Sequence, residues 1–223
     1  EANVPKTSQS KFAPGQNDAQ QSALDKISQL STSPTVRKTR EQTIAQRQLE
    51  YATKAKSFSD SVNAKSASYN VLNQYTSFDI YSASSRLFED NDYDGFYRTF
   101  SVTFDADLHT SYIEQRAEVF ADLYLSRNGG PWELYFTTEP FIIIDDISDD
   151  EYEVLTTLDA GFSAHYYDVL IDVYELGYSD IVATISSEDV DALYALPLES
   201  ADRDRQHKTG SSTSIGIEGG SIS

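Results

Sequence analysis

Residues 96–107 read Phe-Tyr-Arg-Thr-Phe-Ser-Val-Thr-Phe-Asp-Ala-Asp, and this stretch decides the class of fold. Phe100, Val102 and Phe104 alternate with small hydroxyl-bearing residues, so an extended chain would have one apolar face and one polar face. Such alternation with a period of two is typical of a β-strand that buries one face. The stretch therefore predicts a strand whose apolar side packs into a core.

The same alternation of aromatic or β-branched residues with polar ones continues on both sides of this stretch, from about residue 75 to residue 200. Further strands are expected at 78–88, 112–126, 132–138, 141–144, 151–158, 166–174, 181–185 and 192–198. Asn128-Gly129-Gly130-Pro131 is a strong turn signal between two of them. Because no long helical pattern interrupts the strands, we expect an all-β fold, a jelly-roll-like antiparallel β-sandwich of about eight or nine strands.

Composition divides the chain into four regions. We expect a disordered polar segment at 1–34, a helical segment and linker at 35–74, the sandwich at 75–200, and a flexible Gly/Ser-rich tail at 201–223. Helical composition extends from about residue 35 to residue 57, where the apolar positions Val36, Ile44 and Tyr51 are sparse. This helix is expected to be solvated or to dock only through a narrow stripe.

Charge is distributed unevenly along the chain, whose formal net charge is −19. Residues 1–70 hold ten basic and six acidic side chains, a net of +4, while the remaining residues carry a net of −23. An acidic body repels nucleic acid and anionic membranes, because proteins bind both through phosphates, so we expect no nucleic-acid partner. The chain has no apolar run long enough to span a bilayer, and it has no cysteine for disulfides or thiolate metal sites.

One short segment has the residue order of a calcium loop. Asp90, Asp92 and Asp94 alternate, Gly95 follows at once, and Phe96 can offer a backbone carbonyl. Hard divalent cations take several oxygen ligands in a tight arc, and a glycine at the sixth position allows the sharp turn. The segment therefore predicts a Ca2+ site with these three aspartates and the Phe96 carbonyl as ligands.

The predicted site differs from an EF-hand. Ser101 stands where a bidentate glutamate is expected, and strands flank the loop instead of helices. Asp105 or Asp107, at the far end of the next strand, or a neighbouring loop, is expected to complete the ligand set. The alternative is a solvated acidic turn, because turns also prefer Asp, Asn and Gly. A second acidic run at 145–151 lacks the ordered spacing and the glycine, which favours a solvated turn over a second ion.

The sequence carries no recognisable catalytic constellation. His109, His165 and His207 are far apart along the chain, and no zinc-protease, nucleophile-elbow or phosphate-loop motif occurs. We therefore predict a protein that acts by binding, adhesion or assembly and is not an enzyme. An exposed subset of its fifteen tyrosines could bind a cell-surface protein or carbohydrate.

Two alternatives to this function stay open. The first is a carbohydrate-active or hydrolase accessory module that uses acidic residues on an open sheet. The second is a self-assembling surface polymer, in which the basic N-terminal segment docks on the acidic body of a neighbouring copy. The opposite charges of the two parts of the chain motivate this second alternative.

Six segments of the chain carry a family resemblance: Tyr81–Phe88, Asp90–Phe96, Phe104–Asp107, Leu123–Trp132, Asp149–Leu158 and Leu196–Asp202. Together they resemble the choice-of-anchor H proteins, and they occur in that family's order. The resemblance covers about residues 75–203. It implies a secreted or cell-surface protein of a Gram-negative, often marine, bacterium, and it does not supply a defined activity.

The same family carries interchangeable C-terminal sorting signals. One is the GlyGly-CTERM signal, a glycine pair before a membrane helix and basic residues, which a rhomboid-like protease processes. Gly219-Gly220-Ser221 stands at the position of that pair, without the helix and the basic end, so the chain is either processed or truncated there or ends in a simple tail. The chain contains no methionine, and we expect that a secretory signal peptide has been removed.

Overall fold

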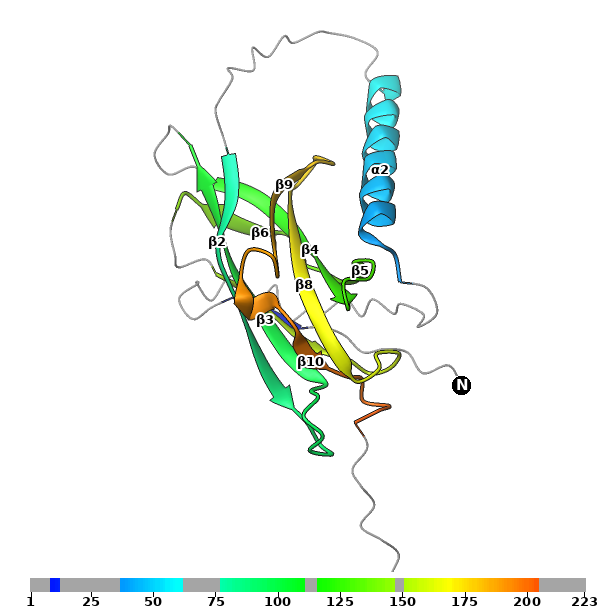
Figure 1. Cartoon of the computed structure of the whole chain (residues 1–223). Coiled ribbons are helices and arrows are strands. Elements are labelled where there is room, and N and C mark those ends of the chain that lie inside the picture. The colour runs from blue at the N-terminus through cyan, green and yellow to red at the C-terminus, as the bar shows by residue number, and fades with distance from the viewer. Residues whose placement is uncertain (1–8, 13–36, 62–76, 111–115, 147–150, 205–223) are drawn as a thin grey trace, which may run out of the picture.

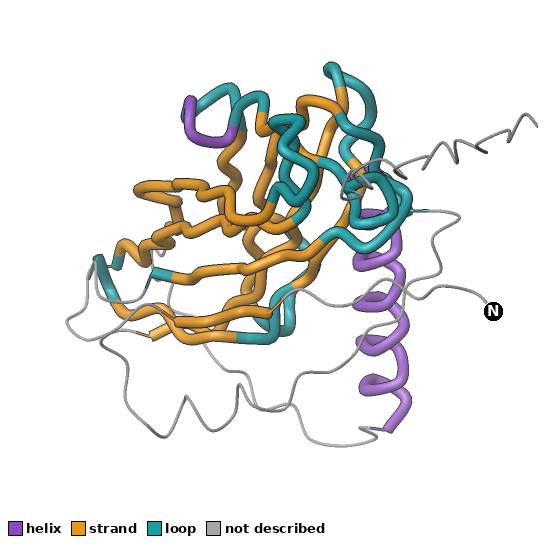
Figure 2. Tube along the Cα trace, turned by 90° about the horizontal axis from the view of Figure 1, so that it is seen from below, coloured by secondary structure: helices purple, strands orange, loops and turns teal. Residues whose placement is uncertain are grey.

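Two antiparallel β-sheets and one long helix make three layers in the computed structural model of the chain (Figure 1). The structure describes residues 9–12, 37–61, 77–110, 116–146 and 151–204. The helix lies against the outer face of the second sheet, beside the strands in the view of Figure 2. The prediction of an all-β antiparallel sandwich is confirmed.

The first sheet has four strands in the order β1-β7-β3-β2. They are β1 (Gln9–Phe12), β2 (Ser77–Glu89), β3 (Thr99–His109) and β7 (Tyr152–Thr157). β2 and β3 form a long hairpin whose connection is the acidic loop, with Glu89 opposite Thr99 where the loop begins and ends. Phe100, Val102 and Phe104 of β3 are buried, as their alternation predicts.

The second sheet has six strands, with β4 and β8 paired along its centre. They are β4 (Arg116–Arg127), β5 (Glu133–Thr137), β6 (Phe141–Ile144), β8 (His165–Glu175), β9 (Ile181–Ser186) and β10 (Leu196–Leu198). β5 and β6 pair with successive parts of β4, and β9 and β10 with different parts of β8. The expected turn after β4 is present, because Asn128 and Gly129 both have positive φ, as a tight hairpin turn requires.

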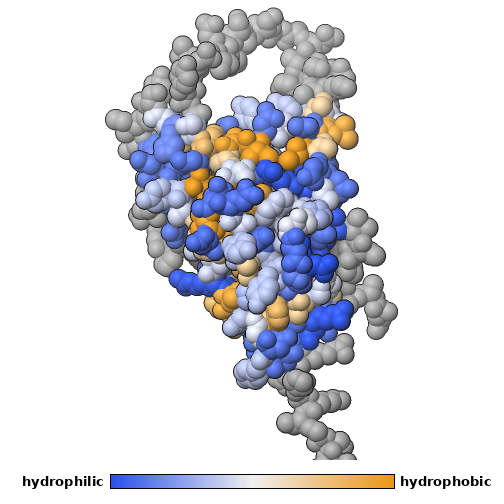
Figure 3. Space-filling view, in the orientation of Figure 1, coloured by the Kyte–Doolittle hydropathy of each residue, from blue (hydrophilic) through white to orange (hydrophobic). Residues whose placement is uncertain are grey.

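The core lies between the two sheets and is rich in aromatic rings. Phe104 of β3, Phe141 of β6 and Tyr152 of β7 are all buried, and the rings of Phe141 and Tyr152 stack with centroids 4.4 Å apart. Phe104 lies 5.8 Å from Tyr152 and 6.1 Å from Phe141. By contrast, the face seen in Figure 3 is mostly hydrophilic, with hydrophobic residues gathered toward its upper end and in smaller patches below.

Two expectations about the strands change. Residues 9–12 fall in the segment expected to be disordered, yet they form β1, paired antiparallel with β7. An edge strand can pair through the free backbone N–H and C=O groups of its neighbour, and amino-acid composition does not show whether a segment has such a neighbour. The strand expected at 192–198 begins instead with a 3₁₀ turn, η1 (Asp191–Leu193), and only its last part pairs as β10. Most of 1–34, the linker after residue 61 and the tail after residue 204 lie outside the described residues.

The helix α2 (Arg40–Ser61) lies in the second region, where helical composition extends from about residue 35 to residue 57, and it ends four residues later than expected. Thr39 and Gln42 cap its start: the Gln42 side chain accepts a hydrogen bond from the Thr39 backbone N–H at 3.1 Å, and the Thr39 hydroxyl accepts one from the Gln42 N–H at 3.4 Å. The preceding residue is tied to β5, because the Leu134 N–H donates to the Lys38 carbonyl at 2.9 Å.

The helix is seated on a row of polar side chains that crosses the outer face of the second sheet. Asp122 on β4 and Asp172 on β8 are direct partners, flanked by Thr137 on β5 and Thr184 on β9. We call these four residues the polar row. Both aspartates are fully buried, and each accepts a hydrogen bond from its flanking threonine, at 2.6 Å for Thr137 and 2.7 Å for Thr184.

Two arginines of α2 supply the positive charge that these buried aspartates need. Arg40 binds Asp172 through two nitrogens, at 2.7 Å and 2.9 Å, and Arg47 binds Asp122 in the same forked way. Because seven residues are close to two helical turns, both arginines lie on one side of the helix. The Arg47 guanidinium also lies 4.6 Å from the ring centroid of Phe120. The narrow stripe by which the helix docks therefore consists of ion pairs together with a cation–π contact.

We predict that Arg47→Ala lowers the free energy of unfolding by about 3–5 kcal/mol, because Asp122 keeps a buried charge without its partner. Urea unfolding followed by circular dichroism measures the loss. Gln48→Ala, at the adjacent exposed position of the same helix, is the matched control and should change the free energy of unfolding by less than about 0.5 kcal/mol. Equal effects of the two substitutions would contradict the role of the buried pair.

Candidate metal centre

The acidic loop between β2 and β3 is curled by hydrogen bonds to its own aspartates. The Asp90 carboxylate accepts the backbone N–H groups of Tyr93 at 2.7 Å and Gly95 at 3.1 Å, and the Asp94 carboxylate accepts the N–H of Phe96 at 2.9 Å. Gly95 has a φ of 92°, in the left-handed region that glycine adopts without strain. The loop therefore has the sharp bend at Gly95 that the calcium-loop pattern requires.

Two groups of three carboxylates meet at this loop and share Asp92. The first group is Asp90, Asp92 and Asp94, and the second is Asp92, Glu199 and Asp204. Within each group, one oxygen from every side chain lies within 4.8 Å of those of the other two. Oxygens that bind one Ca2+-sized ion can be at most about 5 Å apart, since each lies about 2.3–2.6 Å from it. Each group could therefore hold a metal ion.

Asp204 joins the segment after β10 to the loop. One of its carboxylate oxygens accepts the backbone N–H groups of Asn91 at 2.7 Å and Asp92 at 3.1 Å, and the other accepts the Asn91 side-chain amide. The Arg98 Nε lies 3.3 Å from this second oxygen. Asp204 is buried, and its hydrogen bonds tie the loop to the segment that follows β10.

Glu199 enters the site because the end of β10 runs beside the loop. The Tyr97 N–H donates to the Pro197 carbonyl, and the Glu199 N–H donates to the Tyr97 carbonyl, both at 3.0 Å. The Glu199 side chain is only 1% exposed, and its Oε1 accepts no hydrogen bond from any described group. A buried carboxylate oxygen without a donor is costly, so this atom points to a missing positive partner.

The environment of Glu199 favours its neutral form in the absence of a cation. Burial first, and then the negative charges of Asp94, Asp92, Asp204 and Asp90, together raise the pKa of the Glu199 carboxyl to about 7. Desolvation and like charge both disfavour the carboxylate, and a bound cation would offset both.

The structure brings together part of the predicted ligand set. Asp90, Asp92 and Asp94 form one group, as their spacing predicts. Phe96 comes two residues after Asp94, and its backbone N–H donates to the Asp94 carboxylate. The Phe96 carbonyl remains a predicted ligand.

Asp105 and Asp107, which we expected to complete the set, lie elsewhere. They are six and eight residues beyond Thr99 along β3, opposite Ser82 and Asp79 of β2. Since a strand advances about 3.3 Å per residue, roughly 20 Å or more of strand separates them from the loop. The partners of the loop come instead from a neighbouring segment, and no local feature distinguishes Glu199 or Asp204 among the 36 acidic residues of the chain.

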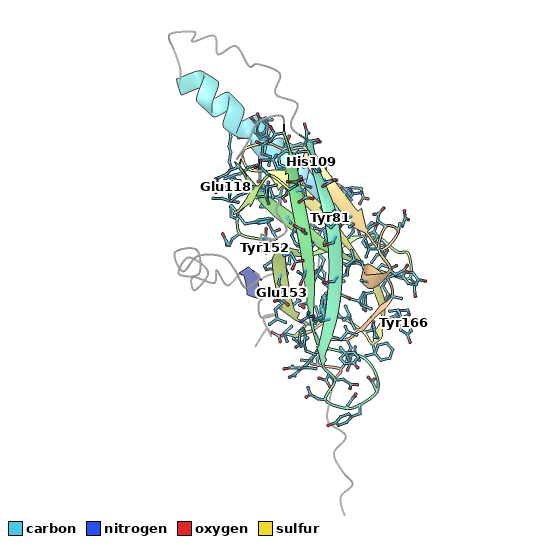
Figure 4. All side chains as sticks on the ribbon, turned by 90° about the vertical axis from the view of Figure 1, so that its left-hand side faces the viewer. Tyr81, His109, Glu118, Tyr152, Glu153 and Tyr166 are labelled. Carbon is cyan, nitrogen blue, oxygen red and sulfur yellow. The ribbon has the colours of Figure 1, made fainter. Side chains whose placement is uncertain are left out.

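A third group of acidic residues lies at the other end of the hairpin. Asp107 is grouped there with Asp79 and His109, and the Asp79 carboxylate lies 3.1 Å from the His109 ring, a hydrogen bond that raises the pKa of His109. Figure 4 shows His109 and Tyr166 toward opposite ends of the sandwich, so the histidines of β3 and β8 do not meet. His207 and residues 147–150 of the second acidic run lie outside the described residues.

Comparison with family models, curated proteins and solved structures finds no match to this chain. The role of the protein is therefore inferred from its own residues, and the resemblance to the choice-of-anchor H proteins stays a prediction. Among the helices that the structure describes, none is long and apolar enough to cross a membrane.

We predict that the metal-free protein loses stability as the pH rises from about 4.5 to about 7. These two values are the ordinary pKa of the Glu199 carboxyl and its pKa in the folded protein. In this window the folded protein binds the proton more tightly than the unfolded chain, so raising the pH favours unfolding. Thermal melts in a chelator at several pH values measure the effect. Glu199→Gln should weaken this dependence, whereas Glu188→Gln, at an exposed position, should preserve it. An unchanged pH dependence in Glu199→Gln would contradict the assignment.

Proposed function

We propose that this chain is a secreted or cell-surface β-sandwich that binds Ca2+ at the β2–β3 loop and acts by binding, adhesion or assembly. The observation that supports it best is the buried Glu199 carboxylate, which has an oxygen without a donor and faces Asp92 and Asp204. All the candidate ligands are oxygens, which suit hard cations such as Ca2+ and not thiophilic metals.

Calcium fits these residues better than magnesium does. Ca2+ takes six to eight oxygens in a flexible arrangement, whereas Mg2+ demands a strict octahedron and keeps several of its waters. Five carboxylates converge around the loop, in two groups that share Asp92. Extracellular modules bind Ca2+ with dissociation constants of about 10⁻⁴–10⁻³ M, which suits a protein outside the cell.

An ion in this position would join parts of the chain that are far apart in sequence. Asp90, Asp92 and Asp94 lie between two strands of the first sheet, while Glu199 follows β10 of the second sheet. The ion would therefore clamp the two sheets at one end of the sandwich. Such a role stabilises a surface on which other residues can bind a partner, and it requires no catalytic chemistry.

The self-assembly alternative depends on the basic segment docking on a neighbour. In the structure, the basic helix α2 is seated on the polar row of its own chain, through Arg40 and Arg47. This contact pairs the opposite charges within one molecule, so we favour binding of a different partner over assembly through this helix. The hydrolase or accessory-module alternative would be favoured by turnover that a single carboxylate substitution abolishes.

We predict that Ca2+ raises the melting temperature of chelator-treated protein. A ligand that binds only the native state at about 100 times its dissociation constant adds about 2.7 kcal/mol to the free energy of unfolding. Differential scanning calorimetry measures the shift. Asp92→Asn, at the residue shared by both carboxylate groups, should abolish it, and Asp79→Asn, in the group at the other end, should leave it intact. The proposal is overturned if Ca2+ produces no shift, or if the shift survives Asp92→Asn.

The affinity for Ca2+ should also depend on pH. Because Glu199 must lose its proton before it can bind the ion, and its pKa is about 7, the affinity should fall roughly tenfold between pH 8 and pH 6. Isothermal titration calorimetry in buffers of different ionisation enthalpy measures both the affinity and the proton release. Glu199→Gln should bind more weakly at pH 8 and lose most of this pH dependence. Release of no proton on Ca2+ binding to the wild-type protein at pH 6 would exclude Glu199 from the ligand set.

A further inference from the structure

The end of the sandwich that carries the acidic loop also presents aromatic rings to solvent. Tyr93, within the loop, is 89% exposed, and Tyr166, near the start of β8, is 55% exposed. A single exposed ring is common and needs no explanation. Tyr166 differs because two other aromatic rings, those of Phe96 and His165, lie against its ring.

Two rings contact the Tyr166 ring, and a hydrogen bond joins the Tyr166 backbone to the His165 side chain. The Phe96 ring lies 5.7 Å from it at an angle of 56°, and the His165 ring lies 6.3 Å from it, nearly perpendicular. The Tyr166 N–H donates to the His165 Nδ1 at 2.7 Å, and the Asn128 side-chain nitrogen lies 3.1 Å from the His165 Nε2. We call Phe96, His165 and Tyr166 the aromatic platform.

The platform shares both of its supporting segments with the candidate metal centre. Phe96 directly follows the loop, and its N–H is bound to the Asp94 carboxylate. On the other side, Tyr166 is the β-sheet partner of Pro197, which lies two residues before Glu199. Binding of an ion by Asp94 and Glu199 would therefore fix the two segments on which the rings rest.

We propose that the aromatic platform binds a neutral glycan and that Ca2+ at the adjacent loop promotes this binding. The inference rests on the proposed function, since it uses the same ion, and it names the class of partner. It assigns Tyr166 as the ring on which the glycan stacks.

The chemistry of the platform matches that of a sugar ring. A pyranose has an apolar face of C–H groups and a rim of hydroxyls, and a tyrosine ring offers an apolar face with a polar edge. His165 lies beside the Tyr166 ring and Asn128 lies beside His165, while the exposed Asp94 belongs to the loop that ends at Phe96. Amide, imidazole and carboxylate groups can donate to or accept from sugar hydroxyls.

Charge and surface pattern argue for a neutral sugar over other partners. The region after residue 70 carries a net charge of −23, which repels anionic polysaccharides. The polar groups nearest the rings, Asn128 beside His165 and Asp94 bonded to the Phe96 N–H, suit the hydroxyls of a sugar. A glycan needs only separate rings with hydrogen-bonding groups between them.

Affinity gel electrophoresis with soluble polysaccharides tests the proposal. Full-length protein should be retarded in Ca2+ by at least one neutral polysaccharide from a set of laminarin, galactomannan and hydroxyethyl cellulose, and not by carboxymethyl cellulose, which is anionic. Tyr166→Ala should weaken the binding by about tenfold or more. Tyr81→Ala, at a ring that is 77% exposed on β2 and distant from the loop, should bind as the wild type does.

Melting curves of the same variants separate this proposal from the calcium site. Tyr166→Ala should keep the full Ca2+-induced shift in melting temperature, whereas Asp92→Asn should lose both the shift and the glycan binding. If no neutral polysaccharide retards the protein, if carboxymethyl cellulose alone does so, or if Tyr166→Ala binds as the wild type does, the glycan proposal is overturned. If the Ca2+ shift persists in those cases, the calcium site stands; if the shift is absent in the wild type, the proposed function itself fails.

Discussion

A carboxylate that is removed from water needs a positive partner, because burying an unpaired charge costs more than most packing can return. This requirement organises the molecule in two places. On the outer face of the second sheet, Asp122 and Asp172 are buried, and the arginines of α2 pair with both. At the end of the sandwich, Glu199 is buried as deeply, and no described side chain donates to its Oε1. The first site is completed within the chain, and the second is suited to an ion from outside it.

The polar row explains how a helix with few apolar residues stays attached to a sheet. Among the described side chains of α2, only Thr43 is buried, so little apolar contact holds the helix. Forked pairs from Arg40 and Arg47 reach aspartates that face each other across β4 and β8, and the two flanking threonines satisfy further lone pairs. The geometry is demanding, because both ends of each pair must be placed correctly to offset desolvation. The helix is consequently placed by charge recognition, with its position set by the spacing of two arginines.

The candidate metal centre brings distant segments together in a similar way. Its candidate ligands come from the β2–β3 loop of the first sheet and from the segment that follows β10 of the second sheet. Phe96, two residues after Asp94, contacts the exposed ring of Tyr166, and Pro197, two residues before Glu199, pairs with the Tyr166 backbone. An ion that orders the two segments would thereby order the platform. In the proposal, the buried carboxylate and the glycan-binding ring are linked through these two segments.

By itself, the sequence determined the strand-rich region, the helix and the curled loop, because each depends on neighbouring residues: alternation at Phe100–Phe104, the helical composition of residues 35–57 and the spacing of Asp90 to Gly95. The tertiary structure decided which carboxylates complete the site. Asp204 binds Asn91 from 113 positions away, and Glu199 reaches the loop only because β10 runs beside Tyr97. In a chain with 36 acidic residues, those that pair with an arginine or meet in the candidate metal centre are distinguished by burial and proximity. Both are properties of the folded chain, and no local pattern contains them.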